Sequence, residues 1–219
     1  MTGFISYPLT HDPVGDFSLS DSTLVFAWNQ RRLTRVQQSA THFGFVYEGT
    51  ASLACSAGTF HLKTGMYFAV PGEFSIEHGS GMIVSRLGFQ GFFHVGGPVE
   101  SEGRLRYING CTDSLLIPPV SWGNPCLNLL HFPPDTKQSQ HTHPSLRAGL
   151  VFRGAGYCAT AGELIPLAPG TLFVIGSGAT HSFHTTESPM VVLAYHPDSD
   201  FGPTHENHPM INRTIIAEQ

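Results

Sequence analysis

The chain has 219 residues, enough for one large domain or two small ones, and its 16 acidic against 11 basic side chains give a net charge of −5. This balance argues against nucleic acid as a partner, because phosphate binding needs a concentrated positive face and the basic residues cluster only at Arg31, Arg32 and Arg35. No apolar run approaches the roughly 20 residues of a membrane span. The first residues also lack the apolar core of a signal peptide, so we expect a cytoplasmic protein with no membrane partner.

The composition favours many short strands joined by tight turns. Gly (24) and Pro (16) together exceed a sixth of the chain, whereas charged residues make up only 12%. The low charge is compatible with the subunit interface of a homodimer, and a solvated surface rich in Ser, Thr and Gln is the equal alternative. The four cysteines lie far apart without CxxC spacing and are expected to be buried small hydrophobes, with Cys126 or Cys158 as an alternative thiol ligand.

In chain order, residues 1–22 are non-periodic and are interpreted as an N-terminal arm. A first barrel is expected over residues 23–92, where turn sequences separate evenly spaced apolar strands. The expected strands are Thr23–Trp28, His42–Tyr47, Ala51–Ser56, Gly58–Leu62, Met66–Val70, Phe74–His78 and Gly81–Phe89. Residues 93–122 interrupt this rhythm and are expected to form a connection with a short helix or a crossing strand pair. The strand pattern then resumes in a second barrel, residues 123–196, before a C-terminal arm, residues 197–219.

An internal repeat supports this division into two similar units. When the chain is aligned with itself at an offset of 105, positions 44–68 contain seven identities. The identities include Gly49 with Gly154 and Gly65 with Gly170, which fall at expected turns where the backbone needs a positive φ. The sequence therefore predicts two similar β units in tandem.

The histidines of the second half suggest a metal site. Eight of the 13 histidines follow residue 130, and His141 and His143 are two apart, so that on a strand both face the same side. A later strand beginning near His181 can bring a third imidazole to this pair in a small barrel. Three neutral imidazoles suit one divalent transition metal: Fe, Zn, Ni, Mn or Cu. Solvated histidines on an exposed strand are the alternative interpretation.

This arrangement resembles the cupin superfamily. The first cupin motif places H-x-H before a Glu and a Gly, and here His141-Thr142-His143 is followed by Arg147 and Gly154 at the same spacing. The second motif resembles the segment 170–181, which keeps both glycines and ends in His181, although Gly176 replaces its proline and Thr185 its asparagine. The resemblance implies an all-β fold: a tandem duplication of a double-stranded β-helix, or jelly-roll, cupin barrel.

Two departures from the motifs shape the predicted site. The glutamate that usually adds a fourth ligand is Arg147, and a guanidinium cannot bind a cation, so the resemblance implies a three-histidine site with metal ligands His141, His143 and His181. Arg147 is interpreted as a clamp for a substrate anion, or alternatively as a structural ion-pair partner of Glu163 or Glu187. In the first half, Val36, Gln38 and Ile76 align with the three histidines at the repeat offset, which predicts a first barrel without metal.

The leading functional hypothesis is a metal-dependent enzyme acting on a small polar or carboxylated molecule. The resemblance favours dioxygenase-like chemistry, while isomerase or lyase chemistry suits the residues equally well. Two alternatives stay open: a non-catalytic cupin sensor that binds metal or a small ligand, and a structural protein with a vestigial site. His131 and His184 are expected in core or outer positions.

Overall fold

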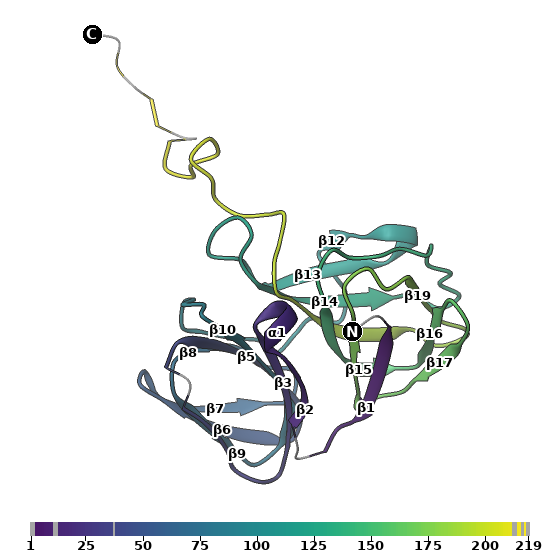
Figure 1. Cartoon of the computed structure of the whole chain (residues 1–219), viewed down its shortest axis with the longest axis horizontal. Coiled ribbons are helices and arrows are strands. Elements are labelled where there is room, and N and C mark those ends of the chain that lie inside the picture. Colours follow the sequence, from purple (N-terminus) through teal and green to yellow (C-terminus); the bar gives the residue numbers. More distant parts are fainter. Residues whose placement is uncertain (1–2, 11–12, 37, 212–213, 216, 218–219) are drawn as a thin grey trace.

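A computed structural model describes residues 3–10, 13–36, 38–211, 214–215 and 217. The chain forms two β-barrels side by side (Figure 1), and helix is confined to the single turns α1 (Ser18–Asp21) and η1 (Ile108–Gly110) among the described residues. Every strand pair is antiparallel, as expected for jelly-roll barrels. None of the helices in the described segments is long and apolar enough to span a membrane.

The first barrel consists of a six-stranded and a four-stranded sheet. The six-stranded sheet has the order β11 (His94–Gly96), β8 (Tyr67–Pro71), β5 (Ala40–Glu48), β10 (Ser80–Leu87), β3 (Thr23–Asn29) and β2 (Pro13–Phe17). The four-stranded sheet has the order β4 (Leu33–Arg35), β9 (Phe74–Glu77), β6 (Thr50–Cys55) and β7 (Gly58–Lys63).

The second barrel repeats this plan with a seven-stranded and a three-stranded sheet. The larger sheet has the order β1 (Phe4–Pro8), β18 (Thr171–Ile175), β15 (Arg147–Gly154), β20 (Met190–His196), β14 (Cys126–Phe132), β13 (Thr112–Ile117) and β12 (Leu105–Arg106). The smaller sheet has the order β17 (Leu164–Leu167), β16 (Gly156–Thr160) and β19 (His181–His184).

The duplication is visible in one cross-strand pair of each barrel. Gly44 pairs with Phe68 between β5 and β8, and Gly149 pairs with Phe173 between β15 and β18. A Cβ atom added to Gly44 would lie 2.0 Å from the Phe68 ring, and one added to Gly149 would lie 2.2 Å from the Phe173 ring. In each barrel the phenylalanine therefore occupies the space that the missing side chain leaves.

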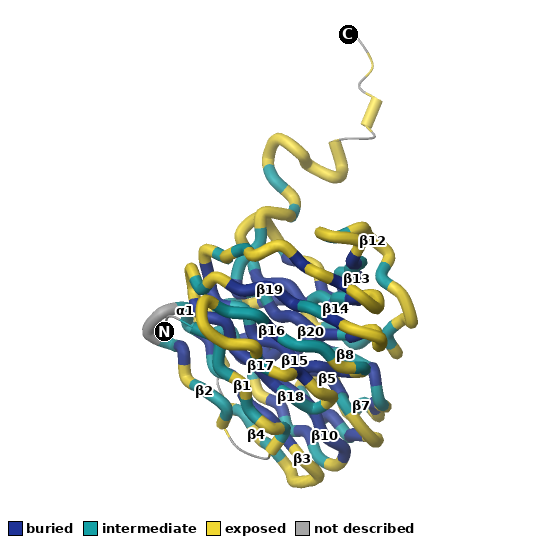
Figure 2. Tube along the Cα trace, turned by 90° about the vertical axis from the view of Figure 1, so that its right-hand side faces the viewer, coloured by how far each residue is buried: buried dark blue, intermediate teal, exposed yellow. Residues whose placement is uncertain are grey.

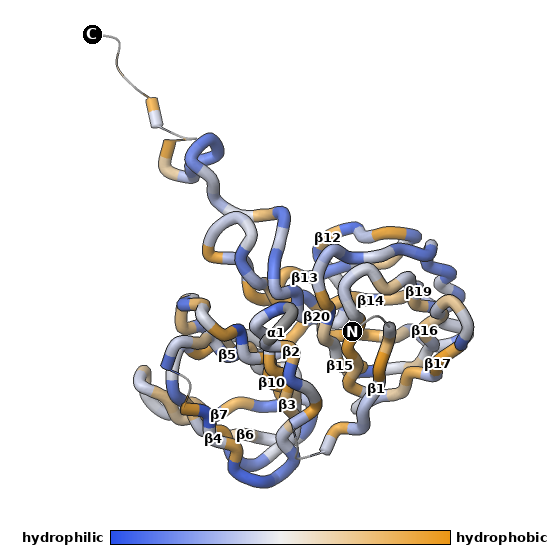
Figure 3. Tube along the Cα trace, in the orientation of Figure 1, coloured by the Kyte–Doolittle hydropathy of each residue, from blue (hydrophilic) through white to orange (hydrophobic). Residues whose placement is uncertain are grey.

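Three apolar cores hold the molecule together. One fills the first barrel and includes Trp28 and Phe68, and a second fills the other barrel around Phe173 and Phe183. The third lies between the barrels, where Phe45 meets Phe152 edge-on at a ring-centroid distance of 4.9 Å. The larger sheets are therefore buried on both faces, which explains why their strands are almost continuously apolar. Figures 2 and 3 show these buried, apolar strands against an exposed and mainly hydrophilic C-terminal segment.

The expected arm and connection contain strands that join the barrels. β1 pairs with β18 of the second barrel, whereas β2 joins β3 of the first. In the connection, β11 extends the first barrel, and β12 and β13 extend the sheet of the second. These strands are too short to stand out in the sequence, and their partners are set by tertiary packing. Beyond Ser199, whose hydroxyl donates to the carbonyl of Asn124, the described residues 203–211 project away from both barrels (Figure 1).

Candidate metal centre

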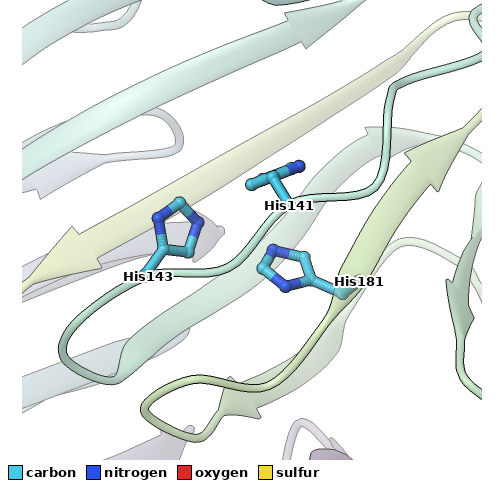
Figure 4. A group of neighbouring side chains, drawn as sticks. All are labelled: His141, His143 and His181. Carbon is cyan, nitrogen blue, oxygen red and sulfur yellow. The ribbon is translucent and has the colours of Figure 1, made fainter.

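The three histidines singled out in the sequence meet inside the second barrel. His141 forms an antiparallel bridge with His181 at the start of β19, and His143 lies at the approach to β15. Their ring centroids are 4.5 to 5.1 Å apart. One possible ligand atom from each residue lies within 4.8 Å of the others, and the three side chains turn toward one another (Figure 4). This geometry is that of a site able to surround one ion.

Backbone carbonyls orient two of the rings. Nδ1 of His141 lies 2.9 Å from the carbonyl oxygen of Ser139, and Nδ1 of His181 lies 2.9 Å from that of Ala179. Because a carbonyl only accepts, each Nδ1 must carry the hydrogen, so that Nε2 keeps its lone pair in the neutral ring. Nε2 of His181 is buried and has no hydrogen-bond partner. A buried nitrogen lone pair of this kind is suited to a metal ligand.

The surroundings keep the imidazoles of His143 and His181 neutral. Burial, followed by the charge of Arg147, lowers the pKa of His143 to about 3. Burial also lowers the pKa of His181 to about 4, although its bond to the Ala179 carbonyl acts in the opposite direction. Metal ligation requires the deprotonated ring, which both residues therefore present at neutral pH. The donor set fits a divalent transition metal.

Arg147 lies against the same cavity. Its Nη1 donates to the hydroxyl of Ser145 at 2.6 Å and to the carbonyl of Leu146 at 2.9 Å, and it lies 3.6 Å from a carboxylate oxygen of Asp198. Its ion-pair partner is thus Asp198, whereas the sequence had suggested Glu163 or Glu187. Asp198 is distant in sequence and lies in the segment expected to be an arm, so only the folded chain reveals the pair. The Nε atom of Arg147 is buried without a hydrogen-bond partner.

Sequence reasoning missed several residues of this cavity. Asp113 and Asn128 come from β13 and β14, Tyr107 precedes η1, and His196 ends β20. The amide of Asn128 donates to Oδ2 of Asp113 at 2.7 Å, while Oδ1 of Asp113 is buried without a partner. Burial raises the pKa of Asp113. Because Asp113 and Tyr107 lie in the segment predicted to be a connection, no sequence signal placed them in the barrel.

The other residues weighed in the sequence lie elsewhere. His131 is buried but does not line the cavity, and His184 stacks on Tyr157 at a centroid distance of 4.9 Å. Cys126 and Cys158 are buried, and the group of possible metal ligands found among the described residues contains neither. The enclosed space beside the histidines has a volume of about 60 Å³. Since one water molecule needs about 10–15 Å³ of such space, the cavity admits a few waters or one small ligand.

The strand registers correct the predicted counterparts of the histidines in the first barrel. In the first barrel, Phe74 pairs with Cys55 on one side and with Arg35 on the other. In the second barrel, His181 pairs in the same way with Thr160 and with His141. Phe74 and Arg35 therefore stand at the positions of His181 and His141, where the uniform offset had placed Ile76 and Val36. The cause is a turn before β19 that is two residues longer than the turn before β9, counted from Phe68 and Phe173. Neither phenylalanine nor arginine is a metal ligand. Gln37, which follows Arg35 by two positions as His143 follows His141, lies outside the described residues.

The fold and this cluster define an all-β protein of two barrels with a candidate metal centre in the second. Residues 128–196 match the family model described as a cupin domain. The second barrel thus matches a cupin domain, and the whole chain has the fold of two such barrels in tandem. No curated protein matches its sequence.

Solved structures agree with this fold. The salicylate 1,2-dioxygenase from Pseudaminobacter salicylatoxidans is 13% identical with a TM-score of 0.64, and the match covers 82% of this chain and 72% of that chain. A structure of the same enzyme with gentisate is also 13% identical with a TM-score of 0.64, and the match covers 88% of this chain and 73% of that chain. A cupin 2 conserved barrel domain protein from Leptotrichia buccalis is 13% identical with a TM-score of 0.59 and 88% of each chain covered. At these identities the likeness concerns the fold.

Proposed function

We propose that His141, His143 and His181 bind one divalent transition metal and that the second barrel is a metal-dependent enzyme for a small anionic molecule. The observation that carries this proposal is the buried, unpartnered Nε2 of His181, with its Nδ1 held by the Ala179 carbonyl beside two further imidazoles. When bound, the metal would act as a Lewis acid on a ligand oxygen or activate O₂. The salicylate dioxygenase neighbours support the oxygenase version, with isomerase or lyase chemistry as the alternative.

Arg147 would orient the anionic group of the substrate. Its side chain is only 11% exposed, and the carboxylate of its one ion-pair partner, Asp198, is 44% exposed and 3.6 Å away. A buried guanidinium gains from a desolvated carboxylate that accepts two parallel hydrogen bonds, and Nε of Arg147 lacks a partner. These contacts support an anion clamp beside the metal.

Asp113 is the residue that would move a proton. Its raised pKa and unpartnered Oδ1 allow this carboxyl to accept a proton while Asn128 fixes its other oxygen. It lines the same cavity as the three imidazoles and Arg147. The site would thus contain a metal, an anion clamp and a proton acceptor.

The small cavity favours a second candidate function, a non-catalytic module that holds a metal or a small ligand. An enclosed space of about 60 Å³ is far below the 300–1,000 Å³ typical of drug-sized ligand pockets. An enzyme with a larger substrate would need the wall around this cavity to move. Oxygen consumption and product formation with metal-loaded protein and a panel of small acids separate the two functions.

Metal binding is tested by replacing the ligands one at a time. We expect His141→Ala, His143→Ala and His181→Ala each to lose the metal that the wild-type protein retains after reloading and desalting, as measured by elemental analysis. His184→Ala is the matched control, because His184 shares β19 with His181 but stacks on Tyr157 outside the cluster. Unchanged metal content in all three ligand variants would show that the assignment is wrong.

A thermal shift provides an independent readout. A metal that binds only the folded state, present at 1,000 times its dissociation constant, stabilises the protein by about 4 kcal/mol. The wild type and His184→Ala should therefore melt at a higher temperature with metal than with a chelator. A wild-type protein that retains no metal and shows no shift would contradict metal binding and leave a vestigial site or a module that binds a small ligand without metal.

A further inference from the structure

The first barrel has its own cavity where the second has its histidine cluster. This cavity has a volume of about 560 Å³ and is lined by β4, the end of β6 and the turn between β8 and β9. Phe74 and Arg35, the counterparts of His181 and His141, form part of its wall. The corresponding place in the duplicated fold has therefore exchanged metal-binding side chains for an arginine and an aromatic ring.

The arginine of this wall is partly buried and lacks an acidic partner. Arg35 lies over the ring of Phe26, 3.6 Å from its centroid, and its Nη1 donates to the carbonyl of Thr34. Its Nε is buried with no hydrogen-bond partner, and none of the ion pairs found among the described residues involves Arg35. A cation taken out of water without a counter-charge is costly. An anionic ligand at this place would supply the missing charge.

Neighbouring polar groups leave the cavity positively charged. Arg32 also lines it, and its Nη2 donates to the hydroxyl of Ser75 on the neighbouring strand β9. The carboxylate of Glu73 lies on the same wall, keeps its charge and accepts a hydrogen bond of 3.1 Å from the amide of Gln38. Two guanidinium groups against one carboxylate leave the wall with a net positive charge.

The volume of the cavity favours an organic anion over an inorganic one. A space of 560 Å³ falls within the 300–1,000 Å³ of small-molecule sites, whereas an inorganic anion occupies only a small part of it. The apolar part of the wall that a ligand can reach consists of Pro71 and of Val36, which is 65% exposed, whereas Phe74 belongs to the core and is only 3% exposed. Apolar surface next to a guanidinium fork suits a carboxylate carried on an apolar body.

We propose that the cavity of the first barrel binds a small organic acid, with its carboxylate on Arg35 and Arg32 and its apolar body against Pro71 and Val36. This site is independent of the metal centre proposed for the second barrel. The duplicated fold would then present two ligand sites of different chemistry, one built on imidazoles and one on guanidinium groups.

Cys55 offers a local reporter of this binding. It lines the cavity and is partly exposed, whereas the other three cysteines are buried. The probe is benzoate, tested on the full-length protein by the rate at which iodoacetamide alkylates Cys55, followed by peptide mass spectrometry. Benzamide, which has the same size without the charge, is the ligand control. Because the second barrel lies outside this reporter's reach, benzoate bound near Arg147 does not contribute to the signal.

We expect benzoate at four times its dissociation constant to slow the alkylation of Cys55 about fivefold, since only the free fraction reacts. Benzamide should give no protection, and Arg35→Gln should abolish the protection by benzoate. Arg31→Gln is the matched variant, because it removes a neighbouring charge that does not line the cavity. Absence of protection in the wild type, equal protection by benzamide, or equal loss in both variants would overturn the proposal. The comparison of benzoate with benzamide uses the wild type alone and does not depend on the folding of any variant.

Discussion

Replacing Gly149 with alanine tests the packing that the two barrels share. The added Cβ would lie 2.2 Å from the nearest atom of the Phe173 ring and 2.8 Å from the carbonyl oxygen of Leu193. Neither neighbour can move away easily. The Phe173 ring is held between Phe4 and Phe183, at centroid distances of 5.3 and 5.5 Å, and the Leu193 carbonyl belongs to the adjacent strand β20.

Overpacking of a buried site typically costs 1–3 kcal/mol, and the backbone contact places this site near the upper end, at about 3 kcal/mol. For a chain of this length, that loss corresponds to a melting temperature lower by roughly 6–12 °C. Thermal unfolding followed by circular dichroism measures the change. Gly162→Ala is the control, because a Cβ there meets no atom within 4 Å, and its stability should stay within about 0.5 kcal/mol of the wild type.

The reasoning would be refuted if Gly149→Ala melted at the same temperature as Gly162→Ala. A second comparison tests the equivalence of the two barrels. Gly44→Ala places its Cβ 2.0 Å from the Phe68 ring and should also lower the melting temperature. If only one of the two glycine variants had a lower melting temperature, the two barrels would not share this packing.

Three further predictions concern contacts that the sequence did not reveal. Phe4→Ala should destabilise the protein by about 2 kcal/mol in thermal unfolding, because β1 contributes this partly buried ring to the aromatic cluster around Phe173; a change as small as that of the exposed Ser6→Ala would argue against this docking. Asp198→Asn should cost no more than about 1 kcal/mol, because its carboxylate is 44% exposed, and a larger loss in urea unfolding would show that the Arg147 pair is stronger than its geometry indicates. Ser85→Ala should cost about 1–2 kcal/mol, since its hydroxyl lies 2.7 Å from Nδ1 of the fully buried His42; unchanged thermal stability would mean that this hydrogen bond contributes nothing.

The duplication accounts for how the two barrels diverged in chemistry. The shared core, represented by the pairs Gly44–Phe68 and Gly149–Phe173, stays constant because a change on one strand clashes with its neighbour. The rim between β4 and β9, and its counterpart between His141 and β19, is less constrained, and there the residues differ. In the first barrel this place holds an arginine and an aromatic ring, and in the second it holds imidazoles.

The homodimer, the cytoplasmic location and the identity of the metal stay predictions from sequence. The low charge that suggested a subunit interface has a partial explanation within one chain, since the third apolar core lies between the barrels. The contact of Phe43 with Tyr195, at a centroid distance of 5.3 Å, is part of this internal interface.

Much of the fold could be predicted from local sequence patterns. The evenly spaced apolar strands, the turn glycines and the 105-residue repeat indicated two β units, because strand and turn preferences depend on neighbouring residues. The spacing of His141, His143 and His181 likewise selected the residues that the fold brings together. Each of these features consists of short local segments that can be compared along the chain without knowledge of its tertiary contacts.

The tertiary structure alone decided which distant segments complete each barrel. β1 joins a strand more than 160 residues later, Asp198 pairs with Arg147, and Asp113 enters the histidine cavity from the segment expected to be a connection. The turn before β19 is two residues longer than the turn before β9, so that Phe74 rather than Ile76 is the counterpart of His181. This difference likewise appears only in the strand registers. These pairings follow from complementary packing between remote surfaces, which no local pattern of residues encodes.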